Sequence, residues 1–292
     1  MRKILVLSGG GVRGMSQAVV LKKLEKDYGS LHNFYDLILG SSVGAINASM
    51  IASGKITMDR LEHIYPEMIE KIFKKRLFRV PLYDRKEFYK IFIDEIGAIK
   101  LKDCLTKLQI TSLSICDNRN HFFKSWTKDG EELLMSEVAK SFAAPLYFGT
   151  FIDEKHKQVF FDGGTGVANI PIAYGIVEAQ LLWPNDEWFF DIIGCGFTDD
   201  NVSFDEAKRF KTIRQLGKFF NFDDGGLARS QVRQEQIGAI TQLAKSSKKI
   251  SFRYWDTAIP KKFDKLDGVK FLPEYKKFGE KMATAPLNVM PF

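Results

Sequence analysis

The chain has 292 residues, 45% of them hydrophobic, which is enough apolar material for a substantial core. No stretch approaches the roughly 18 apolar residues of a membrane-spanning helix, and the apolar run after Met1 is too short for a secretory signal. The net charge of +7 suits anionic partners, but no nucleic-acid-binding motif accompanies it, so we expect no nucleic acid as partner. Three cysteines without C-x-x-C spacing indicate reduced thiols in a cytoplasmic protein and argue against zinc.

The start of the chain predicts alternating strands and helices. Ile4–Leu7 fits a short buried strand, and helical spacing follows over Met15–Tyr28. Tyr35–Leu39 fits a second buried strand, and Val43–Ala52 fits a helix rich in small residues. This β-α-β-α order predicts an α/β fold with a mainly parallel sheet that helices cover on both faces.

Further elements follow along the chain. We expect an amphipathic helix at Met58–Lys75, a short helix at Glu132–Phe142 and a long helix at Leu227–Lys245. Four more strands are expected, at Leu108–Cys116, Phe122–Trp126, Val159–Phe161 and Phe189–Gly194. From Ser203 onward only helices are predicted, the first with a capping box of Ser203 and Glu206. Without a linker or a repeat, residues 1–292 are expected to form a single domain, with a motif-bearing core of about residues 1–200 and a helical C-terminal portion of about residues 201–292.

A glycine-rich loop, LSGGGVRG, spans Leu7–Gly14 and follows the first strand. It is not a nucleotide P-loop, because Met15 and not lysine follows the last glycine. The spacing G-x-G-x-x-G also fits a dinucleotide-binding turn, but the acid expected at the end of the second strand is missing, and Asp36 lies at that strand's beginning. A third interpretation depends on the motif that follows the second strand.

That motif is Gly40-Ser-Ser-Val-Gly44, which fits the nucleophile elbow G-x-S-x-G. The spacing selects Ser42 and not Ser41 as the exposed hydroxyl on a strand-to-helix turn. Loops after neighbouring parallel strands can lie side by side, so the glycine loop would face Ser42. Its bare N–H groups could then stabilise the oxyanion of an acyl-transfer reaction. The simpler alternative is a pair of small-residue turns that only pack strand against helix.

A serine nucleophile needs a base. Of the four histidines, His63, His121 and His156 follow Ser42, and each fits a surface or boundary position better than a base. Asp162 is the stronger candidate, because it ends the strand at Val159–Phe161 and two glycines clear the space after it. The same triplet at residues 224–226 lies between helical stretches and is discounted as a connecting loop.

Four motifs occur in one order along the chain, namely Gly9-Gly-Gly-Val-Arg-Gly14, Gly40-Ser-Ser-Val-Gly44, Ser141-Phe-Ala-Ala-Pro-Leu-Tyr-Phe148, and Asp162-Gly-Gly164 with Asn169 and Pro171 behind it. Together they resemble the patatin-like phospholipases, in particular the compact bacterial members. The resemblance implies a three-layer α/β/α fold, a Ser-Asp dyad without histidine, and lipid acyl hydrolysis with the glycine loop as oxyanion hole. We expect the reaction to need no cofactor and no metal. The substrate would be a phospholipid or a lysophospholipid.

Residue by residue, Ser42 matches the nucleophile, Asp162 the base, and Gly10 and Gly11 the oxyanion donors. Arg13 matches a basic position often found in the glycine loop. The supporting glycines of the motifs are Gly9, Gly14, Gly40, Gly44, Gly163 and Gly164.

One position departs from the resemblance. The family often has an acid where this chain has Ser8, which leaves open how the glycine loop is held. The C-terminal third carries no matching motif, so activation and head-group preference stay open, as does a role as a secreted effector. Two alternatives in function also stay open: an acyltransferase of related fold, and a non-catalytic nucleotide- or lipid-binding protein.

The segment Glu70–Phe92 interleaves basic and aromatic residues, a pattern that suits an anionic membrane surface. The simpler interpretation assigns most of its aromatic residues to the core and leaves the charges solvated. Asp199-Asp200-Asn201 lacks the glycine and the distal glutamate of a calcium-binding loop. We therefore expect peripheral membrane contact, with Lys74, Lys75 and Arg76 contributing to it, and no metal site.

Overall fold

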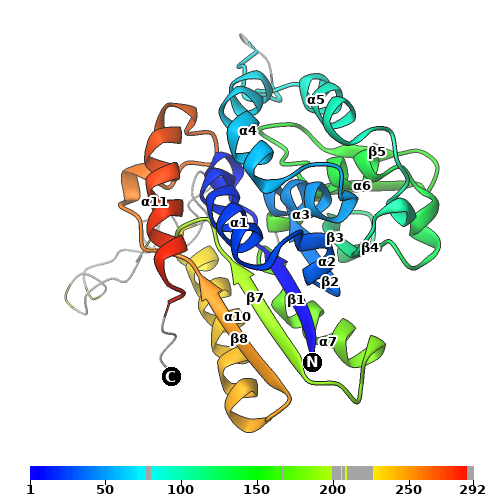
Figure 1. Cartoon of the computed structure of the whole chain (residues 1–292). Coiled ribbons are helices and arrows are strands. Elements are labelled where there is room, and N and C mark those ends of the chain that lie inside the picture. The colour runs from blue at the N-terminus through cyan, green and yellow to red at the C-terminus, as the bar shows by residue number, and fades with distance from the viewer. Residues whose placement is uncertain (77–79, 166–167, 199–204, 206–207, 209–225, 288–292) are drawn as a thin grey trace.

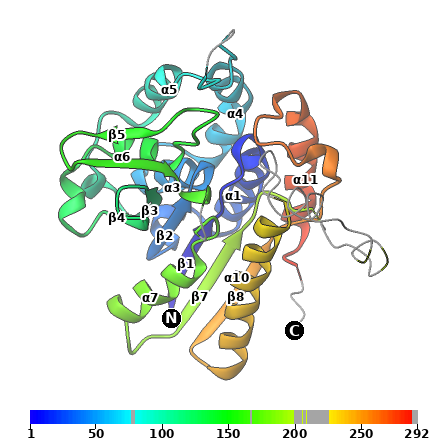
Figure 2. The same cartoon turned by 180° about the vertical axis from the view of Figure 1, so that it is seen from behind.

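The computed structural model describes residues 1–76, 80–165, 168–198, 205, 208 and 226–287. In these ranges an eight-stranded sheet carries helices on both faces (Figures 1 and 2). The strands are β1 (Arg2–Leu7), β2 (Leu37–Ser41), β3 (Lys107–Ser114), β4 (Arg119–Lys124), β5 (Phe151–Asp153), β6 (Gln158–Asp162), β7 (Trp188–Ile193) and β8 (Ile250–Trp255). The α-helices are α1 (Gly14–Tyr28), α2 (Leu31–Phe34), α3 (Val43–Ser53), α4 (Met58–Ile72), α5 (Lys86–Ile96), α6 (Leu134–Ser141), α7 (Ile172–Leu182), α10 (Gly226–Ser246) and α11 (Leu272–Thr284).

The sheet is parallel along most of its width. Its order is β5-β6-β3-β2-β1-β7-β8, with β4 also paired to β3. The neighbouring strands β3, β2, β1, β7 and β8 pair in parallel. In contrast, β4 and β6 run antiparallel to β3, and β5 runs antiparallel to β6. The predicted α/β class with a mainly parallel central sheet between helical layers is confirmed.

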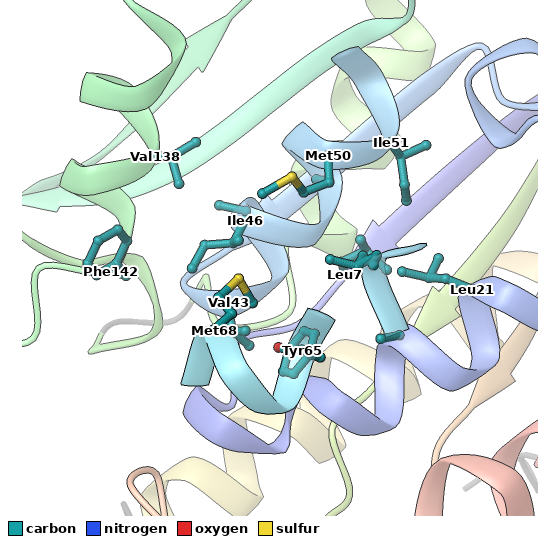
Figure 3. Packing of buried hydrophobic residues seen from close by; sticks show 14 of the residues in the cluster. Leu7, Leu21, Val43, Ile46, Met50, Ile51, Tyr65, Met68, Val138 and Phe142 are labelled. Carbon is teal, nitrogen blue, oxygen red and sulfur yellow. The ribbon is translucent and has the colours of Figure 1, made fainter. Parts of the chain in front are cut away.

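Alternation along β1 shows how the two faces are filled. Leu5 and Leu7 belong to one buried cluster, and Ile4 and Val6 belong to another, because successive side chains of a strand point to opposite faces. The first cluster lies under α1, α3, α4 and α6, and Figure 3 shows part of it. Its members in Figure 3 include Leu7, Leu21, Val43, Ile46, Met50, Ile51, Tyr65, Met68, Val138 and Phe142.

The opposite face carries α7 and α10 (Figure 2). Ile172 and Ala179 of α7, with Ile237 and Ile240 of α10, pack in the second buried cluster. Helices therefore cover both faces of the parallel strands, as buried sheets of this kind require.

The helical prediction for the C-terminal portion is wrong in one respect. β8 lies between α10 and α11 and pairs in parallel with β7 as the edge strand. The segment Ile250–Trp255 is rich in aromatic residues, and hydrophobic Ile250 and Tyr254 alternate with polar Ser251 and Arg253, a strand pattern. The predicted helix at Leu227–Lys245 is present as α10. The capping box of Ser203 and Glu206 lies outside the described residues.

The second strand is shifted from the range predicted for it. Tyr35 caps the C-terminus of the short helix α2, and its N–H donates to the Leu31 carbonyl oxygen at 3.0 Å. The strand therefore starts at Leu37 and continues through Ser41, so the turn at Ser42 follows it directly.

Candidate active site

Strand register along β3 brings the ends of two other strands together. β2 pairs with β3 up to Ser41 opposite Thr111, and β6 pairs with β3 from Ser112 opposite Asp162. Because β4 pairs with Gln109–Ser114 of β3 on one side, β2 and β6 share the other side. They run toward each other and meet end to end. Ser42 follows the end of β2, and Asp162 is the last residue of β6.

The two side chains meet at this junction. The Ser42 hydroxyl donates a hydrogen bond to Oδ2 of Asp162 at 2.7 Å. Oδ1 of Asp162 accepts the Gly164 N–H at 2.7 Å, so its carboxylate is held in one orientation. Both residues are 9% exposed. A nearly buried serine hydroxyl thus contacts a nearly buried carboxylate, with the carboxylate placed to take its proton.

The backbone at Ser42 is unusual. Its φ is +54° and its ψ is −125°, a conformation that non-glycine residues rarely adopt. The Ser42 N–H donates to Oγ of Ser141 at 2.9 Å, and that hydroxyl donates to the Thr111 carbonyl oxygen at 2.5 Å. A side chain at Gly44 would place its Cβ 2.3 Å from the Leu7 carbonyl oxygen, so only glycine fits there. The turn has the geometry of a nucleophile elbow.

The glycine loop lies beside this turn, as predicted for neighbouring parallel strands. β1 and β2 pair up to Leu7 opposite Gly40, and a Cβ added at Gly9 would lie 3.1 Å from the Cβ of Ser42. The N–H of Gly9 donates to the Asn169 carbonyl oxygen at 3.0 Å.

The next two amides of the loop differ from that of Gly9. The N–H groups of Gly10 and Gly11 have no hydrogen-bond acceptor among the described residues. Val12 donates to the Leu266 carbonyl oxygen at 2.9 Å, and Gly14 begins α1. The loop therefore presents two adjacent donors at the position predicted for oxyanion stabilisation.

The loop is held without the acid that the resemblance led us to expect before the glycines. The Ser8 N–H donates to the Ile193 carbonyl oxygen at 3.1 Å, and Nε2 of Gln17 donates to both the Ser8 and Ile193 carbonyl oxygens. Arg13 is 1% exposed, pairs with Asp264, and its Nε donates to the Gly10 carbonyl oxygen at 3.3 Å. No sequence pattern connects Arg13 with an acid 251 positions later, so sequence reasoning missed this contact.

Other candidates from the sequence have different partners. His121 contacts Asp117, and His156 contacts Asp153 through Nδ1 at 2.9 Å. Asp36 accepts the Lys3 N–H at 2.8 Å at the start of β2, at the end opposite the glycine loop. That position does not fit the ribose-binding acid of a dinucleotide site. The Asp-Gly-Gly triplet at residues 224–226 falls largely outside the described residues.

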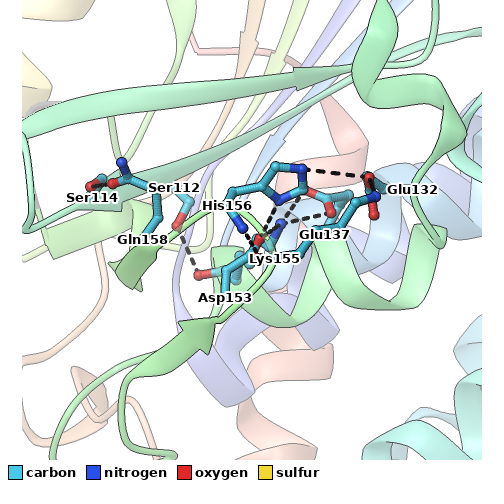
Figure 4. Close-up of polar contacts among 9 residues, drawn as sticks. Ser112, Ser114, Glu132, Glu137, Asp153, Lys155, His156 and Gln158 are labelled. Atoms are coloured by element: carbon cyan, nitrogen blue, oxygen red, sulfur yellow. Dashed lines mark hydrogen bonds and ion pairs between the residues drawn. The ribbon is translucent and has the colours of Figure 1, made fainter.

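A cluster of charges, part of it buried, lies on α6 and on the β5–β6 hairpin that ends in Asp162 (Figure 4). Burial raises the pKa of Glu137 to about 7, and the neighbouring Lys140 offsets this only in part. Burial also opposes ionisation of Asp153, but hydrogen bonds from Lys140 and His156 hold its pKa below the usual range. Lys140 therefore pairs with the carboxylates of both Glu137 and Asp153, and Asp153 also accepts hydrogen bonds from His156.

Neither a metal site nor a membrane-spanning helix occurs in the described part of the chain. No group of three or more His, Cys, Asp or Glu side chains there could hold a metal ion. Within the same residues, no helix has the length and apolar character needed to cross a membrane.

The α/β sheet and the elbow serine define a protein of the nucleophile-elbow class, with an aspartate in contact with the serine and a glycine loop beside it. The model of the family described as patatin-like phospholipase matches residues 5–176, more than half of the chain. The chain belongs to this family.

Two curated relatives are about a quarter identical to this chain over the residues that align. A cGAMP-activated phospholipase of Escherichia coli (strain TW11681) is 27% identical over 197 residues, 60% of this chain and 55% of the relative. A cGAMP-activated phospholipase of Vibrio cholerae is 26% identical over 257 residues, 77% of this chain and 67% of the relative. The chain thus spans between about half and two thirds of these relatives. Among solved structures, VipD from Legionella pneumophila aligns with a TM-score of 0.44 and 12% identity, over 97% of this chain and 66% of that one.

Proposed function

We propose that this chain hydrolyses acyl esters of phospholipids or lysophospholipids, with Ser42 as the nucleophile and Asp162 as its base. The observation that carries the proposal is the 2.7 Å hydrogen bond from the Ser42 hydroxyl to the Asp162 carboxylate, on an elbow turn in a patatin-like chain. The N–H groups of Gly10 and Gly11, which have no acceptor in the part of the chain that the structure describes, support the assignment of the oxyanion hole.

The first half of the reaction forms an acyl-enzyme. Asp162 accepts the proton of the Ser42 hydroxyl as that oxygen bonds to the ester carbonyl carbon. The carbonyl oxygen becomes an oxyanion, to which Gly10 and Gly11 donate hydrogen bonds. The intermediate then collapses, the bond from carbon to the alcohol oxygen breaks, and Asp162 returns the proton to the departing alcohol.

The second half releases the fatty acid. A water molecule gives a proton to Asp162 and attacks the acyl carbon on Ser42, again through an oxyanion. The bond from the acyl carbon to the Ser42 oxygen breaks, and that oxygen regains a proton from Asp162. The free carboxylic acid leaves, and both side chains are restored.

The test compares substitutions at the site with one beside it. Ser42→Ala and Asp162→Asn should each abolish hydrolysis of a short-chain ester and labelling by a fluorophosphonate, and both proteins should stay folded. Ser41→Ala is the matched control, because the neighbouring Ser41 hydroxyl is buried without a hydrogen-bond partner among the described residues. It should keep most of the activity. Substantial turnover by folded Ser42→Ala protein would refute the assignment.

Two alternatives have their own readouts. An acyltransferase shares the acyl-enzyme, so we would identify products in the presence and absence of an acceptor alcohol. Predominant transfer at a low acceptor concentration would favour the transferase. A non-catalytic nucleotide- or lipid-binding protein would not react with the fluorophosphonate, because only an activated serine is labelled.

We also propose contact with an anionic membrane surface through Lys74, Lys75 and Arg76, which follow α4. Lys74 and Lys75 are exposed. Three aromatic residues of the same segment are buried in the core, namely Tyr83, Phe88 and Phe92. Their burial supports the simpler interpretation, in which these aromatic residues fill the core. The charges of this segment, and not most of its aromatic residues, are therefore the proposed contact.

A further inference from the structure

A short segment from the C-terminal part of the chain lies directly on the glycine loop. We call residues Asp264–Asp267 the 264–267 segment. The carbonyl oxygen of Leu266 accepts the Val12 N–H at 2.9 Å. Gly11 has a φ of +60°, and a Cβ added there would lie 2.2 Å from the same carbonyl oxygen. The segment therefore packs against the backbone of the loop, immediately beside the two amides that have no acceptor among the described residues.

One end of the segment is tied to the loop by a buried ion pair. Asp264 pairs with Nη1 of Arg13, and both side chains are nearly inaccessible, at 8% and 1% exposure. Nε of Arg13 donates to the Gly10 carbonyl oxygen at 3.3 Å, so the guanidinium joins Asp264 to the peptide unit of Gly10. The second oxygen of Asp264 accepts the Thr198 hydroxyl at 3.3 Å. A buried pair of this kind is weak grounds for stability, but it can specify one arrangement of the groups around it.

The other end of the segment is hydrogen-bonded to the connection between α4 and α5. The Tyr83 hydroxyl donates to the Asp267 carboxylate at 2.7 Å, and Tyr83 is buried. Its ring is in edge contact with Phe73 and stacks on Tyr147, with centroids 5.0 Å and 6.2 Å apart. Lys75 also approaches Asp267, but at 4.0 Å and with an exposed side chain, so that contact adds little.

We infer that the 264–267 segment positions the oxyanion donors, with Asp264 acting through Arg13 and Asp267 held by Tyr83. The inference rests on the proposed function. A run of three glycines has many accessible backbone conformations, and oxyanion stabilisation requires N–H groups that already point at the developing charge. The segment restricts the loop from outside the matched family region, which ends at residue 176. Asp264 and Asp267 are positioning residues, because neither contacts the reacting atoms.

The experiment measures kcat and KM on a short soluble ester, and the rate of fluorophosphonate labelling, for Asp264→Asn. Loss of one oxyanion donor costs roughly 100-fold in kcat, and a displaced donor should cost less, so we expect kcat to fall by about tenfold. KM should stay within about twofold, because binding of the uncharged ester does not use the oxyanion hole. Labelling should slow in parallel with kcat, since the phosphonyl adduct places an oxygen where the oxyanion forms. Asp264→Glu, which keeps the charge, should recover part of the loss.

Asp191→Asn is the matched control. Asp191 is also a buried aspartate in an ion pair, with Nη2 of Arg253 at 2.7 Å, but it joins β7 to β8 and does not touch the glycine loop. It should lower the melting temperature without changing kcat or the labelling rate of the folded protein. If Asp264→Asn does not fold, Tyr83→Phe decides, because it removes the hydroxyl bound to Asp267 and keeps the ring. We expect a smaller fall in kcat from Tyr83→Phe, again at constant KM.

The outcomes separate the two proposals. Wild-type protein that the probe does not label overturns the proposed function and this inference with it. If the probe labels the wild type and Asp264→Asn equals it in kcat and labelling rate, the inference alone is overturned. If Asp264→Asn does not fold, the same result for Tyr83→Phe overturns it. If Asp264→Asn loses activity only in proportion to its folded fraction, as Asp191→Asn should, the inference is also overturned.

Discussion

Ser42 sits in a backbone conformation that L-residues avoid, with φ of +54°. Such positions cost of the order of 1–3 kcal/mol and persist only where the surroundings hold them. Here the surroundings are β2 on one side and α3 on the other, with Gly40 packed so closely that an added Cβ would lie 2.4 Å from the Gly44 carbonyl oxygen. The hydroxyl of Ser141 provides the acceptor for the Ser42 N–H and so closes the turn.

We predict that Ser141→Ala weakens both the turn and the catalysis. The substitution removes the partner of two buried groups, the Ser42 N–H and the Thr111 carbonyl oxygen. Leaving such groups unpaired costs about 1–3 kcal/mol in the free energy of unfolding. Because the Ser42 turn loses its closing bond, kcat on a soluble ester should fall at an unchanged KM. Urea unfolding and steady-state kinetics on the same preparation measure both effects.

The control for this prediction is Ser49→Ala on α3. The Ser49 hydroxyl is also buried and donates to the Ala45 carbonyl oxygen at 2.7 Å, but it is not bonded to the Ser42 amide. Ser49→Ala should leave kcat unchanged. Equal kcat values for Ser141→Ala and Ser49→Ala would show that the closing bond does not matter for the reaction.

At the scale of single residues, local motifs predicted which side chains meet. The elbow spacing and the Asp-Gly-Gly triplet pointed to Ser42 and Asp162, whose oxygens are 2.7 Å apart, while their catalytic roles stay predictions. Ser141 lies in a motif that carried the resemblance, but no spacing rule says that its hydroxyl accepts the Ser42 amide. Asp264 is one of two acids in a lysine-rich stretch, and nothing local distinguishes it from a solvated one. Contacts between distant segments depend on packing that one sequence does not display.

Helix α6 and the hairpin of β5 and β6 are joined by buried charge, and that hairpin ends in Asp162. Lys140 contacts Glu137 at 2.8 Å and Asp153 at 2.7 Å. His156, which is partly exposed, contacts Asp153 at 2.9 Å and approaches Glu132 at 3.7 Å (Figure 4). Among the described residues, Lys140 donates to both oxygens of the Glu137 carboxylate, and the charges of Glu132 and Asp153 also act on it.

The pKa of Glu137 leads to a prediction for stability. Burial raises this pKa from 4.5 to about 7, so between these values the folded protein holds a proton that the unfolded chain has released. The stabilisation is present below pH 4.5 and is lost as the pH rises through about 7. Between pH 5 and 8, wild type should therefore lose up to about 3 kcal/mol of unfolding free energy relative to Glu137→Gln. Urea unfolding at each pH measures the difference.

Histidine titrates in the same range and needs its own control. His156→Asn, introduced into both the wild type and Glu137→Gln, removes the histidine of this cluster. The difference between the two curves should persist in that background. Parallel curves for wild type and Glu137→Gln would mean that Glu137 is already ionised at pH 5.

Elements with clear periodicity were predicted, and those that depend on position in the sheet were not. The helix at Met58–Lys75 is present as α4, because its apolar residues repeat on one side. β8 was missed although Ile250–Trp255 alternates, since a helical interpretation was extended over the whole C-terminal portion. α7 was also missed, because its almost uniformly apolar sequence shows no helical period. One side of this helix packs on the sheet, while the apolar side chains of Val177 and Leu181 are exposed.

Over the whole molecule, a single sheet contains strands from both ends of the chain. The matched family region ends at residue 176, but β7 and β8 extend the same sheet beyond it. Helix α11 packs against α1, where the Ser16 hydroxyl donates to the Tyr275 carbonyl oxygen at 2.8 Å. The prediction of a single domain over residues 1–292 stays a prediction, and this continuity supports it.

The carboxyl end of the sheet, where the glycine loop and Ser42 lie, also carries the connection between α4 and α5 (Figure 1). Beside Lys74 and Lys75, two large apolar side chains are exposed there, Val80 at 74% and Leu146 at 56%. They belong to segments that lie together, since the Leu82 N–H donates to the Leu146 carbonyl oxygen at 3.0 Å. Basic and apolar groups thus occur together near the site, as membrane contact would require.

We predict that the protein binds anionic vesicles through this surface and that binding weakens as salt rises through the physiological range. Replacing Lys74, Lys75 and Arg76 with Gln should reduce cosedimentation with phosphatidylserine-containing vesicles and spare hydrolysis of a soluble ester, because each basic residue near such a surface adds about 1 kcal/mol. The matched control replaces Lys245, Lys248 and Lys249, which are exposed around the α10–β8 turn at the opposite end of the sheet (Figure 1). Equal losses in the two triple variants would mean that net charge alone drives binding. Binding that does not depend on lipid charge would remove the α4–α5 connection from the mechanism.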